Sequence, residues 1–338
     1  MQCLRALAAL LVVLEHATLP TQGFSTTAHF EAGAAGVDIF FVLSGYIIYL
    51  TQARVRGVAL FTYRRFVRII PLYWAVTAVF IFLHLVFGEE PGARLPIGHV
   101  IESFLLIPHR TPGLPTEIYP VLVPGWTLCY EMFFYGLFAV GLLVAPGRLA
   151  LFLSVVICSL AALGRLLNPQ QAILATYTSS LSLEFVAGVM IAVMTGSRPP
   201  PRLAGLLVPL GLVLMFLALP GPRFLAWGAP AAMAVYGALA LEPYVRARWP
   251  VLLGDASYSL YLTQFAFLPV LRGAWLASGL PKDALLFAVL GVPACALFGV
   301  AVHLAVERRL LGWLKRPVSR AADHPARAIA PSQAKGEG

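Results

Sequence analysis

The chain has 338 residues, of which 59% are hydrophobic and 12% are charged, and its mean hydropathy is +0.83. Soluble domains carry roughly twice that share of charge, so the composition excludes a soluble globule, and it also excludes disordered, collagen-like and disulfide-scaffold chains. The net charge of +9 does not indicate nucleic-acid binding, because the basic residues lie in short loops where orientation in a membrane explains them. The composition therefore predicts an all-α polytopic protein embedded in the lipid bilayer.

Apolar runs of about 20 residues predict ten transmembrane helices. In chain order they are expected at about 3–20, 35–53, 69–87, 125–145, 149–166, 177–195, 203–219, 224–242, 251–271 and 284–306. The first run is interpreted as a helix rather than a signal peptide, because Glu15 and His16 interrupt the region of a cleavage site. The long segment 88–124 contains an apolar piece, residues 100–107, that is too short to span.

The basic residues predict the orientation of these helices. Counted on alternate sides of the ten spans, 18 of the 24 Lys and Arg residues fall on one side. The positive-inside rule makes that side cytoplasmic, so both termini are expected in the cytoplasm. Residues 1–316 are expected to form one transmembrane domain, and residues 317–338 a disordered cytoplasmic tail.

Three ionisable residues inside predicted spans point to a site. A charge at the centre of a bilayer costs about 2.5–3.5 kcal/mol on insertion scales, so each one needs a reason. On the predicted topology His16, Asp38 and Glu131 come from three helices and meet at one depth in the outer half. They are candidates for a catalytic group, and the alternative is a structural polar network or residues at the interface.

Arginines on the opposite side suggest a binding site for phosphate. Arg5 and His16 are eleven residues apart, so they share one face of the first helix, about 16 Å apart along its axis. If the third helix begins early, Arg65 and Arg68 share a face at i and i+3, and guanidinium groups bind phosphate in a fork. The alternatives are orientation bias and binding of anionic lipid. No CxxC motif or His/Cys cluster is present, so no metal site is expected.

Taken together, five segments resemble motifs of the integral-membrane acyltransferase-3 family. They are residues 5–16 (RALAALLVVLEH), 36–46 (GVDIFFVLSGY), 65–74 (RFVRIIPLYW), 126–131 (WTLCYE) and 257–262 (SYSLYL). The third resembles the Arg-x-x-Arg loop of the family, and the first its Arg and His separated by ten residues. The last motif often continues to a histidine, but this chain has Gln264, so no role of that histidine is transferred.

The resemblance implies a multi-pass O-acyltransferase of the bacterial inner membrane. The co-substrate would be acyl-CoA, with acetyl-CoA expected, and no cofactor would stay bound. The acceptor would be a hydroxyl of a cell-surface glycan or glycolipid. The CoA phosphates would bind Arg5, Arg65 and Arg68. His16 would act as base or carry the acyl group, and Glu131 or Asp38 would orient its ring. Further site candidates are Trp126, Ser44, Tyr258, Tyr261 and Gln264.

Two other functions are compatible with the sequence. The acceptor could be a small molecule such as a macrolide antibiotic, or the buried charges could line the path of a transporter. Acyl length, acceptor identity and oligomeric state are left open by the sequence.

Overall fold

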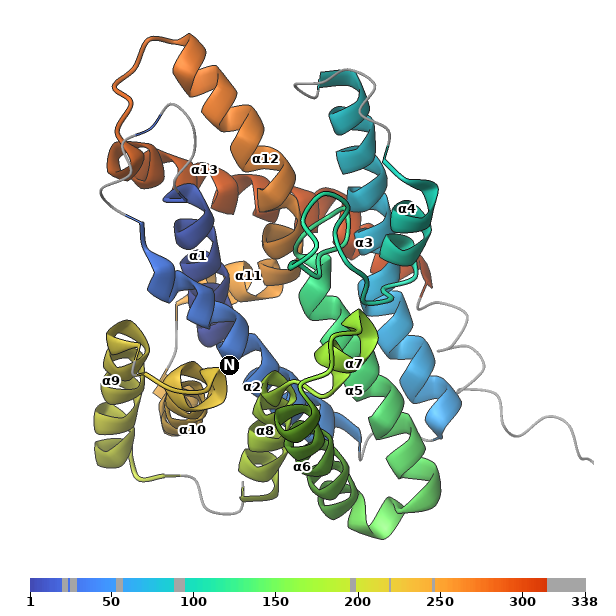
Figure 1. Ribbon diagram of the computed structural model, residues 1–338. Helices are drawn as coiled ribbons and strands as arrows, with labels where there is room; N and C mark the ends of the chain where they lie inside the picture. The colour runs from blue at the N-terminus through green and yellow to red at the C-terminus, as the bar shows by residue number, and fades with distance from the viewer. Residues whose placement is uncertain are drawn as a thin grey trace, which may run out of the picture.

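The computed structural model describes residues 1–19, 24, 29–52, 57–87, 95–194, 199–218, 220–244 and 247–314. Within these ranges every regular element is a helix and no β-strand occurs, which confirms the predicted all-α class (Figure 1). The α-helices are α1 (Gln2–Ala17), α2 (Gly36–Gln52), α3 (Val58–Phe87), α4 (Ile97–Phe104), α5 (Gly125–Val144), α6 (Leu149–Leu167), α7 (Ala172–Tyr177), α8 (Leu183–Val193), α9 (Pro201–Leu217), α10 (Ala229–Leu241), α11 (Arg248–Asp255), α12 (Ser257–Ala277) and α13 (Ala284–Val302). A five-residue 3-10 helix, Glu31–Ala35, leads into α2, and π-helical turns, Phe224–Gly228 and His303–Glu307, flank α10 and α13.

Seven helical stretches among the described residues are long and apolar enough to cross a membrane. They are Glu31–Thr51, Val58–Val86, Gly125–Val144, Pro146–Leu167, Ala172–Val193, Phe224–Tyr244 and Ala284–Leu314. The other three predicted spans fall on α1, α9 and the α11–α12 pair, which are helical. A membrane protein with several spanning helices is therefore supported, and the count of ten spans stays a prediction.

The third helix begins at Val58, eleven residues before its predicted start at 69. Hydropathy placed the start late because residues 64–68 include three arginines. In the structure α3 runs through them as one helix, with Arg64 and Arg68 exposed. Long basic side chains allow this, since they can reach water from the end of an apolar helix. Arg65 and Arg68 therefore lie about one turn apart on α3.

The predicted span 177–195 is interrupted in the structure. α7 ends at Tyr177, a 3-10 turn covers Ser180–Ser182, and α8 begins at Leu183. The side chain of Ser179 accepts a hydrogen bond from the backbone N–H of Leu181. Serine side chains compete in this way with helix hydrogen bonds, which explains the break in a segment that hydropathy predicts as continuous.

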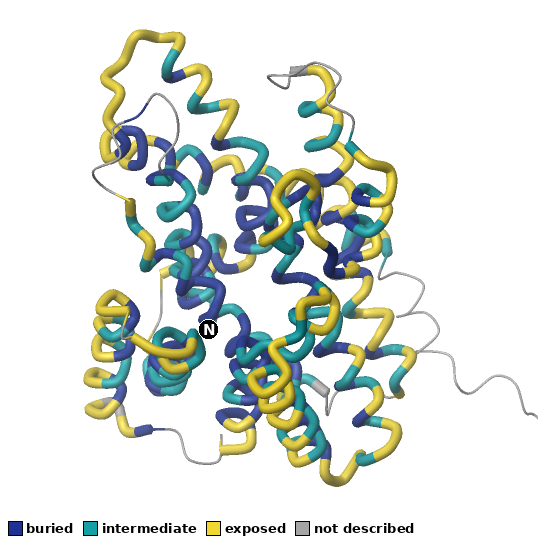
Figure 2. Tube along the Cα trace, in the orientation of Figure 1, coloured by how far each residue is buried: buried dark blue, intermediate teal, exposed yellow. Residues whose placement is uncertain are grey.

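α2 is the central helix of the molecule. In the 18-residue window of the span that contains it, 67% of the residues are buried, whereas the share is 17% in the corresponding window of the span that contains α6 (Figure 2). On α6 most of the exposed side chains are apolar, among them Leu151, Val155 and Leu166. An apolar outer surface of this kind suits contact with lipid, so the burial pattern separates an inner helix from peripheral helices.

A close helix contact joins α2 to α8 through two glycines. A Cβ added at Gly188 would lie 2.0 Å from the carbonyl oxygen of Val42, and one at Gly45 would lie 2.1 Å from that of Phe185. Small residues at such crossings let helix backbones approach closely in membrane proteins. The two glycines therefore set the position of α2, which carries Asp38 and Ser44.

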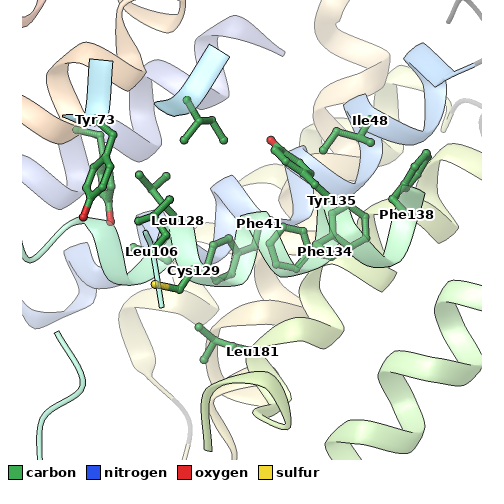
Figure 3. Close-up of a cluster of buried hydrophobic side chains, with 14 of the residues drawn as sticks. Phe41, Ile48, Tyr73, Leu106, Leu128, Cys129, Phe134, Tyr135, Phe138 and Leu181 are labelled. Carbon is green, nitrogen blue, oxygen red and sulfur yellow. The ribbon is translucent and has the colours of Figure 1, made fainter. Parts of the chain in front are cut away.

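Stacked aromatic rings fix α5 against its neighbours. Phe134 stacks on Phe185 of α8 with ring centroids 4.5 Å apart, and Phe138 stacks on Phe61 of α3 at 4.9 Å. Figure 3 shows Phe134 and Phe138 in one buried cluster with Phe41 of α2. Offset aromatic pairs of this kind add stability beyond the burial of their surface. The helix that carries the WTLCYE motif is therefore held against α2, α3 and α8.

The short apolar piece in the segment 88–124, residues 100–107, overlaps α4, an eight-residue helix that ends at Phe104. The hydroxyl of Tyr73 on α3 donates to the carbonyl of Ser103 at 2.8 Å. The Ser103 hydroxyl accepts from the backbone N–H of Val121 at 2.9 Å. These bonds tie α4 to α3 and to the chain just before α5. The prediction that this piece does not span the membrane agrees with its length.

Contacts between distant segments join parts of the chain that the sequence assigns to the same side. The amino terminus at Met1 lies 3.4 Å from a carboxylate oxygen of Glu242, and both are expected inside. Arg110 donates to the carbonyl of Gln170, and both are expected outside. The cytoplasmic position of the termini stays a prediction. The expected tail, 317–338, and the boundary at 316 lie outside the described residues.

Candidate active site

Two adjoining cavities lie between α1, α2, α3, α5 and α12. The arginine cavity has a volume of about 310 Å³ and is defined by Arg5, Arg65 and Arg68. The aromatic cavity has a volume of about 80 Å³ and is defined by Phe40, Phe41, Tyr258 and Tyr261. Both cavities are also lined by the same four polar residues, which are Arg5, Ser44, Arg68 and Glu131. The two spaces therefore meet at a polar collar.

Glu131 of α5 is held by two hydroxyl groups. Ser44 of α2 donates to its Oε1 at 2.8 Å. Tyr135, one turn further along α5, donates to the same oxygen. Hydrogen bonds to a carboxylate stabilise its charged form and fix its orientation. The structure thus brings together Glu131 and Ser44, two residues that the sequence analysis proposed from separate motifs.

Arg5 of α1 is anchored at the start of α12. Its Nε donates to the carbonyl of Gly254 at 3.3 Å, and its Nη2 donates to the hydroxyl of Ser257 at 3.0 Å. Gly254 is needed for this approach, because a Cβ there would lie 2.2 Å from the carbonyl oxygen of Gln2. The first motif and the late motif therefore meet at Arg5.

Arg65 and Arg68 reach the cavities from α3. Arg65 donates from Nη2 to the hydroxyl of Thr51 at 3.0 Å, and its guanidinium lies 5.6 Å from the ring centroid of Phe61. With Arg5, these side chains place three guanidinium groups around the carboxylate of Glu131. The other carboxylate of the arginine cavity, Glu242, lies 3.4 Å from the amino terminus at Met1. The collar and its arginine cavity therefore carry a surplus of two positive charges there, in a setting suited to an anionic ligand.

Two tyrosines of the late motif line the aromatic cavity, but Gln264 does not. The hydroxyl of Tyr258 donates to the carbonyl of Ile69 at 2.7 Å, and that of Tyr261 lies 3.0 Å from the hydroxyl of Thr127. Gln264 is 1% exposed and its Nε2 donates to the carbonyl of Tyr261 at 3.4 Å. Gln264 thus packs one turn beyond the cavity.

His16 lies apart from these cavities and lines neither of them. Its Nδ1 lies 2.8 Å from the carbonyl oxygen of Val12 and 3.0 Å from Oε2 of Glu15. A carbonyl can only accept, so Nδ1 carries the proton, and in the neutral ring Nε2 keeps its lone pair. The carboxylate beside His16 is therefore Glu15, and neither Glu131 nor Asp38, which the sequence analysis expected in that place.

Asp38 is fully buried and is paired with an arginine that sequence reasoning missed. Arg223 donates from Nη2 to Oδ2 at 2.8 Å and from Nε to Oδ1 at 3.3 Å. Glu184 of α8 is also fully buried, and Asp38 and Arg223 are the charged groups that act on it. The signal was available, since Glu184 is a charge inside a predicted span and Arg223 belongs to the minority of basic residues on the outer side.

Arg223 connects this pair to a third cavity of about 280 Å³, which Tyr119, Trp126 and Tyr130 also line and which is called the outer cavity here because the predicted topology places it on the outer side. The rings of Trp126 and Tyr130 meet edge to face with centroids 5.9 Å apart. On α5, Trp126 and Tyr130 line the outer cavity, whereas Thr127 and Glu131 line the aromatic cavity. One face of α5 therefore lines the outer cavity, and another face lines the aromatic cavity. Within the described residues no group of three or more His, Cys, Asp or Glu side chains could hold a metal ion.

Comparison with known proteins agrees with the arrangement of the motifs. The family model described as an acyltransferase domain, that of the acyltransferase-3 family, matches residues 1–304. The chain is 40% identical over 302 residues to the exopolysaccharide production protein ExoZ of Rhizobium meliloti (strain 1021), with 85% of this chain and 92% of that protein covered. No solved structure matches the chain. The chain therefore belongs to the acyltransferase-3 family and is an enzyme that transfers acyl groups.

Proposed function

We propose that this enzyme takes an acyl group, in the first place acetyl, from cytoplasmic acyl-CoA and transfers it to a hydroxyl group of a polysaccharide or its lipid-linked precursor. The protein would lie in the inner membrane of a bacterium with ten spans and both termini in the cytoplasm. The printed name of the similar protein ExoZ, which refers to exopolysaccharide production, supports a polysaccharide as acceptor. The 18 basic residues on one side support the orientation.

The observation that carries the donor assignment is the charge of the arginine cavity. The three arginines and the amino terminus outnumber the two carboxylates of the cavity, Glu131 and Glu242, so the cavity attracts an anion, and CoA carries several phosphate charges. The apolar aromatic cavity continues from the same collar. A donor with a charged head and an uncharged arm would match that order of surfaces.

In the proposed reaction, the hydroxyl oxygen of the acceptor attacks the thioester carbonyl carbon and the carbon–sulfur bond breaks. His16 lines neither cavity, so the proposal requires the acceptor hydroxyl to reach its Nε2, which takes the proton before the proton ends on the sulfur of CoA. A well-placed base is worth roughly 10²–10⁴ in rate. Glu15 would orient the ring at 3.0 Å. The acceptor would approach through the outer cavity, where Trp126 and Tyr130 offer aromatic surface beside Arg223.

The donor site is tested with arginine variants of the same helix. Arg65→Ala and Arg68→Ala should raise the half-saturating concentration of acyl-CoA and leave that of the acceptor unchanged. Arg64→Ala is the matched control, because Arg64 is exposed on α3 and lines neither cavity. If Arg64→Ala has the same effect, or if only the acceptor response changes, the phosphate-binding role is wrong.

Sidedness is tested in sealed vesicles. Inside-out vesicles should consume added labelled acyl-CoA and accumulate modified acceptor in the lumen. Right-side-out vesicles should use it only after permeabilisation. Equal rates in intact and permeabilised right-side-out vesicles would contradict a cytoplasmic donor. Movement of a solute without covalent modification would point to the transporter alternative.

A further inference from the structure

The polarity of the aromatic cavity changes in the same direction along two helices. On α2 the lining residues pass from Ser44 through Phe41 to Val37. On α5 they pass from Glu131 through Leu128 to Thr127, whose hydroxyl donates to the carbonyl of Pro124. Ser44 and Glu131 belong to the collar shared with the arginine cavity, and the lining residues beyond them on α2 and α5 are apolar except for Thr127. The cavity is therefore amphiphilic along its length.

α12 continues this gradient. Ser257 lies beside Arg5, and Tyr258 and Tyr261 follow along the helix. The hydroxyl of Tyr258 is engaged by the carbonyl of Ile69, and that of Tyr261 by Thr127. With both hydroxyls engaged by protein groups, the two rings serve the cavity mainly as apolar wall. Three helices thus agree on which end is apolar.

The apolar end is small and its walls are fixed by packing. Val37, Phe41 and Leu128 are 3–5% exposed. Phe41 stacks on Phe185 with ring centroids 4.6 Å apart, and Phe40 meets the ring of Tyr261 at 6.0 Å. The whole aromatic cavity, of which this end is a part, has a volume of about 80 Å³ and room for roughly five water-sized groups. A long chain does not fit there unless a packed ring moves.

The distance between the two ends suits a ligand that extends from one to the other. Along α2, the arginine cavity reaches Ile48 and the aromatic cavity reaches Val37. Eleven residues of α-helix rise about 16 Å, close to half of the roughly 30 Å hydrocarbon core. A phosphate group held at the arginines would therefore leave room for an uncharged arm before the apolar end.

We infer that the end of the aromatic cavity formed by Val37, Phe41 and Leu128 is the acyl-binding subsite, and that it limits the transferred group to about two to four carbons. This inference rests on the proposed use of acyl-CoA. Leu128 and Val37 are specificity-determining residues, because their side chains set how far the acyl chain extends between α2 and α5.

Binding of S-alkyl-CoA thioethers to the purified full-length protein tests the subsite without turnover. Each methylene that becomes buried should strengthen binding about fourfold, and the gain should stop and reverse beyond about four carbons. Leu128→Ala enlarges the subsite, so its optimum should move to a longer chain. Val37→Leu fills it, so its optimum should move to a shorter one.

Leu153→Ala is the matched control, because Leu153 is a fully buried helical leucine of the same hydrophobic cluster and does not line the cavity. Its chain-length optimum should equal that of the unmodified protein. The same chain-length series as acyl-CoA donors should give parallel shifts in transfer rate. Val37→Leu keeps the test decisive if Leu128→Ala does not fold, since it removes no buried atoms.

The outcomes separate the inference from the proposed function. If CoA and all its thioethers fail to bind and acyl-CoA supports no transfer, the proposed donor is wrong. If the thioethers bind with an affinity independent of chain length, the acyl subsite is wrong although the donor stands. A shift in Leu153→Ala as large as that in Leu128→Ala, or an unchanged optimum in Val37→Leu, overturns the subsite as well.

Discussion

The contact between α2 and α8 gives the sharpest prediction for a single substitution, Gly188→Ala. The added Cβ would lie 2.0 Å from the carbonyl oxygen of Val42, and real Cβ atoms essentially never come closer than 3.0 Å. The two helices must therefore separate by about 1 Å, and overpacking of this kind costs roughly 1–3 kcal/mol of folding free energy. A shift of α2 by that amount can lengthen the 2.8 Å bond from Ser44 to Glu131 beyond hydrogen-bond reach.

The expected result for Gly188→Ala is a lower unfolding temperature together with a loss of transfer rate on the order of 10²-fold, as for other displacements of about 1 Å near a site. The measurements are thermal unfolding of the purified protein and acyl transfer in membranes. Gly136→Ala on α5 is the control, because a Cβ there meets nothing within 4 Å. If Gly188→Ala is as stable and as active as Gly136→Ala, the close crossing of α2 and α8 does not position the site.

Three further predictions concern charged and titratable groups. Arg223→Met should lower the free energy of unfolding by about 3–5 kcal/mol, because it leaves Asp38 buried without its cation. The double variant with Asp38→Asn should lose less of this free energy. Detergent-induced unfolding measures both variants, and equal losses would contradict the pairing. Burial, with a smaller contribution from the neighbouring histidine, lowers the pKa of His99, so the folded state binds fewer protons than the unfolded chain there. The stability that His99 contributes is present above the pKa of the unfolded chain, near 6.5, and is lost as the pH falls through the lower folded-state pKa. The unfolding temperature should therefore fall on acidification. An identical pH profile of the unfolding temperature for His99→Gln would refute this. His16→Ala should abolish transfer while the protein stays folded, and Glu15→Gln should reduce the rate and shift its pH profile; near-normal turnover of His16→Ala would end its assignment as base.

The sequence was sufficient for the class of fold and for the family. In a membrane, the backbone N–H and C=O groups of these apolar runs of about 20 residues can find hydrogen-bond partners only in helices. The positions of the helical segments therefore followed from hydropathy. The ends of the helices were predicted less accurately from hydropathy. α3 starts at Val58 because arginines tolerate a helix end in water, and the break before α8 depends on one serine side chain, which average hydropathy does not detect.

For the candidate site, spacing within one helix was predictable and contacts between helices were not. The sequence predicted that Arg65 and Arg68 share a face of α3, because that depends only on the 3.6-residue period. The meeting of Ser44 with Glu131 depends on how α2 crosses α5. The sequence alone thus determined the membrane class, the family and the candidate residues. The carboxylate beside His16 belongs to its neighbour in the chain, Glu15, although the sequence analysis favoured Asp38 or Glu131. Only the tertiary structure decided that Asp38 pairs with Arg223, because partners on different segments are chosen by packing and not by position in the chain.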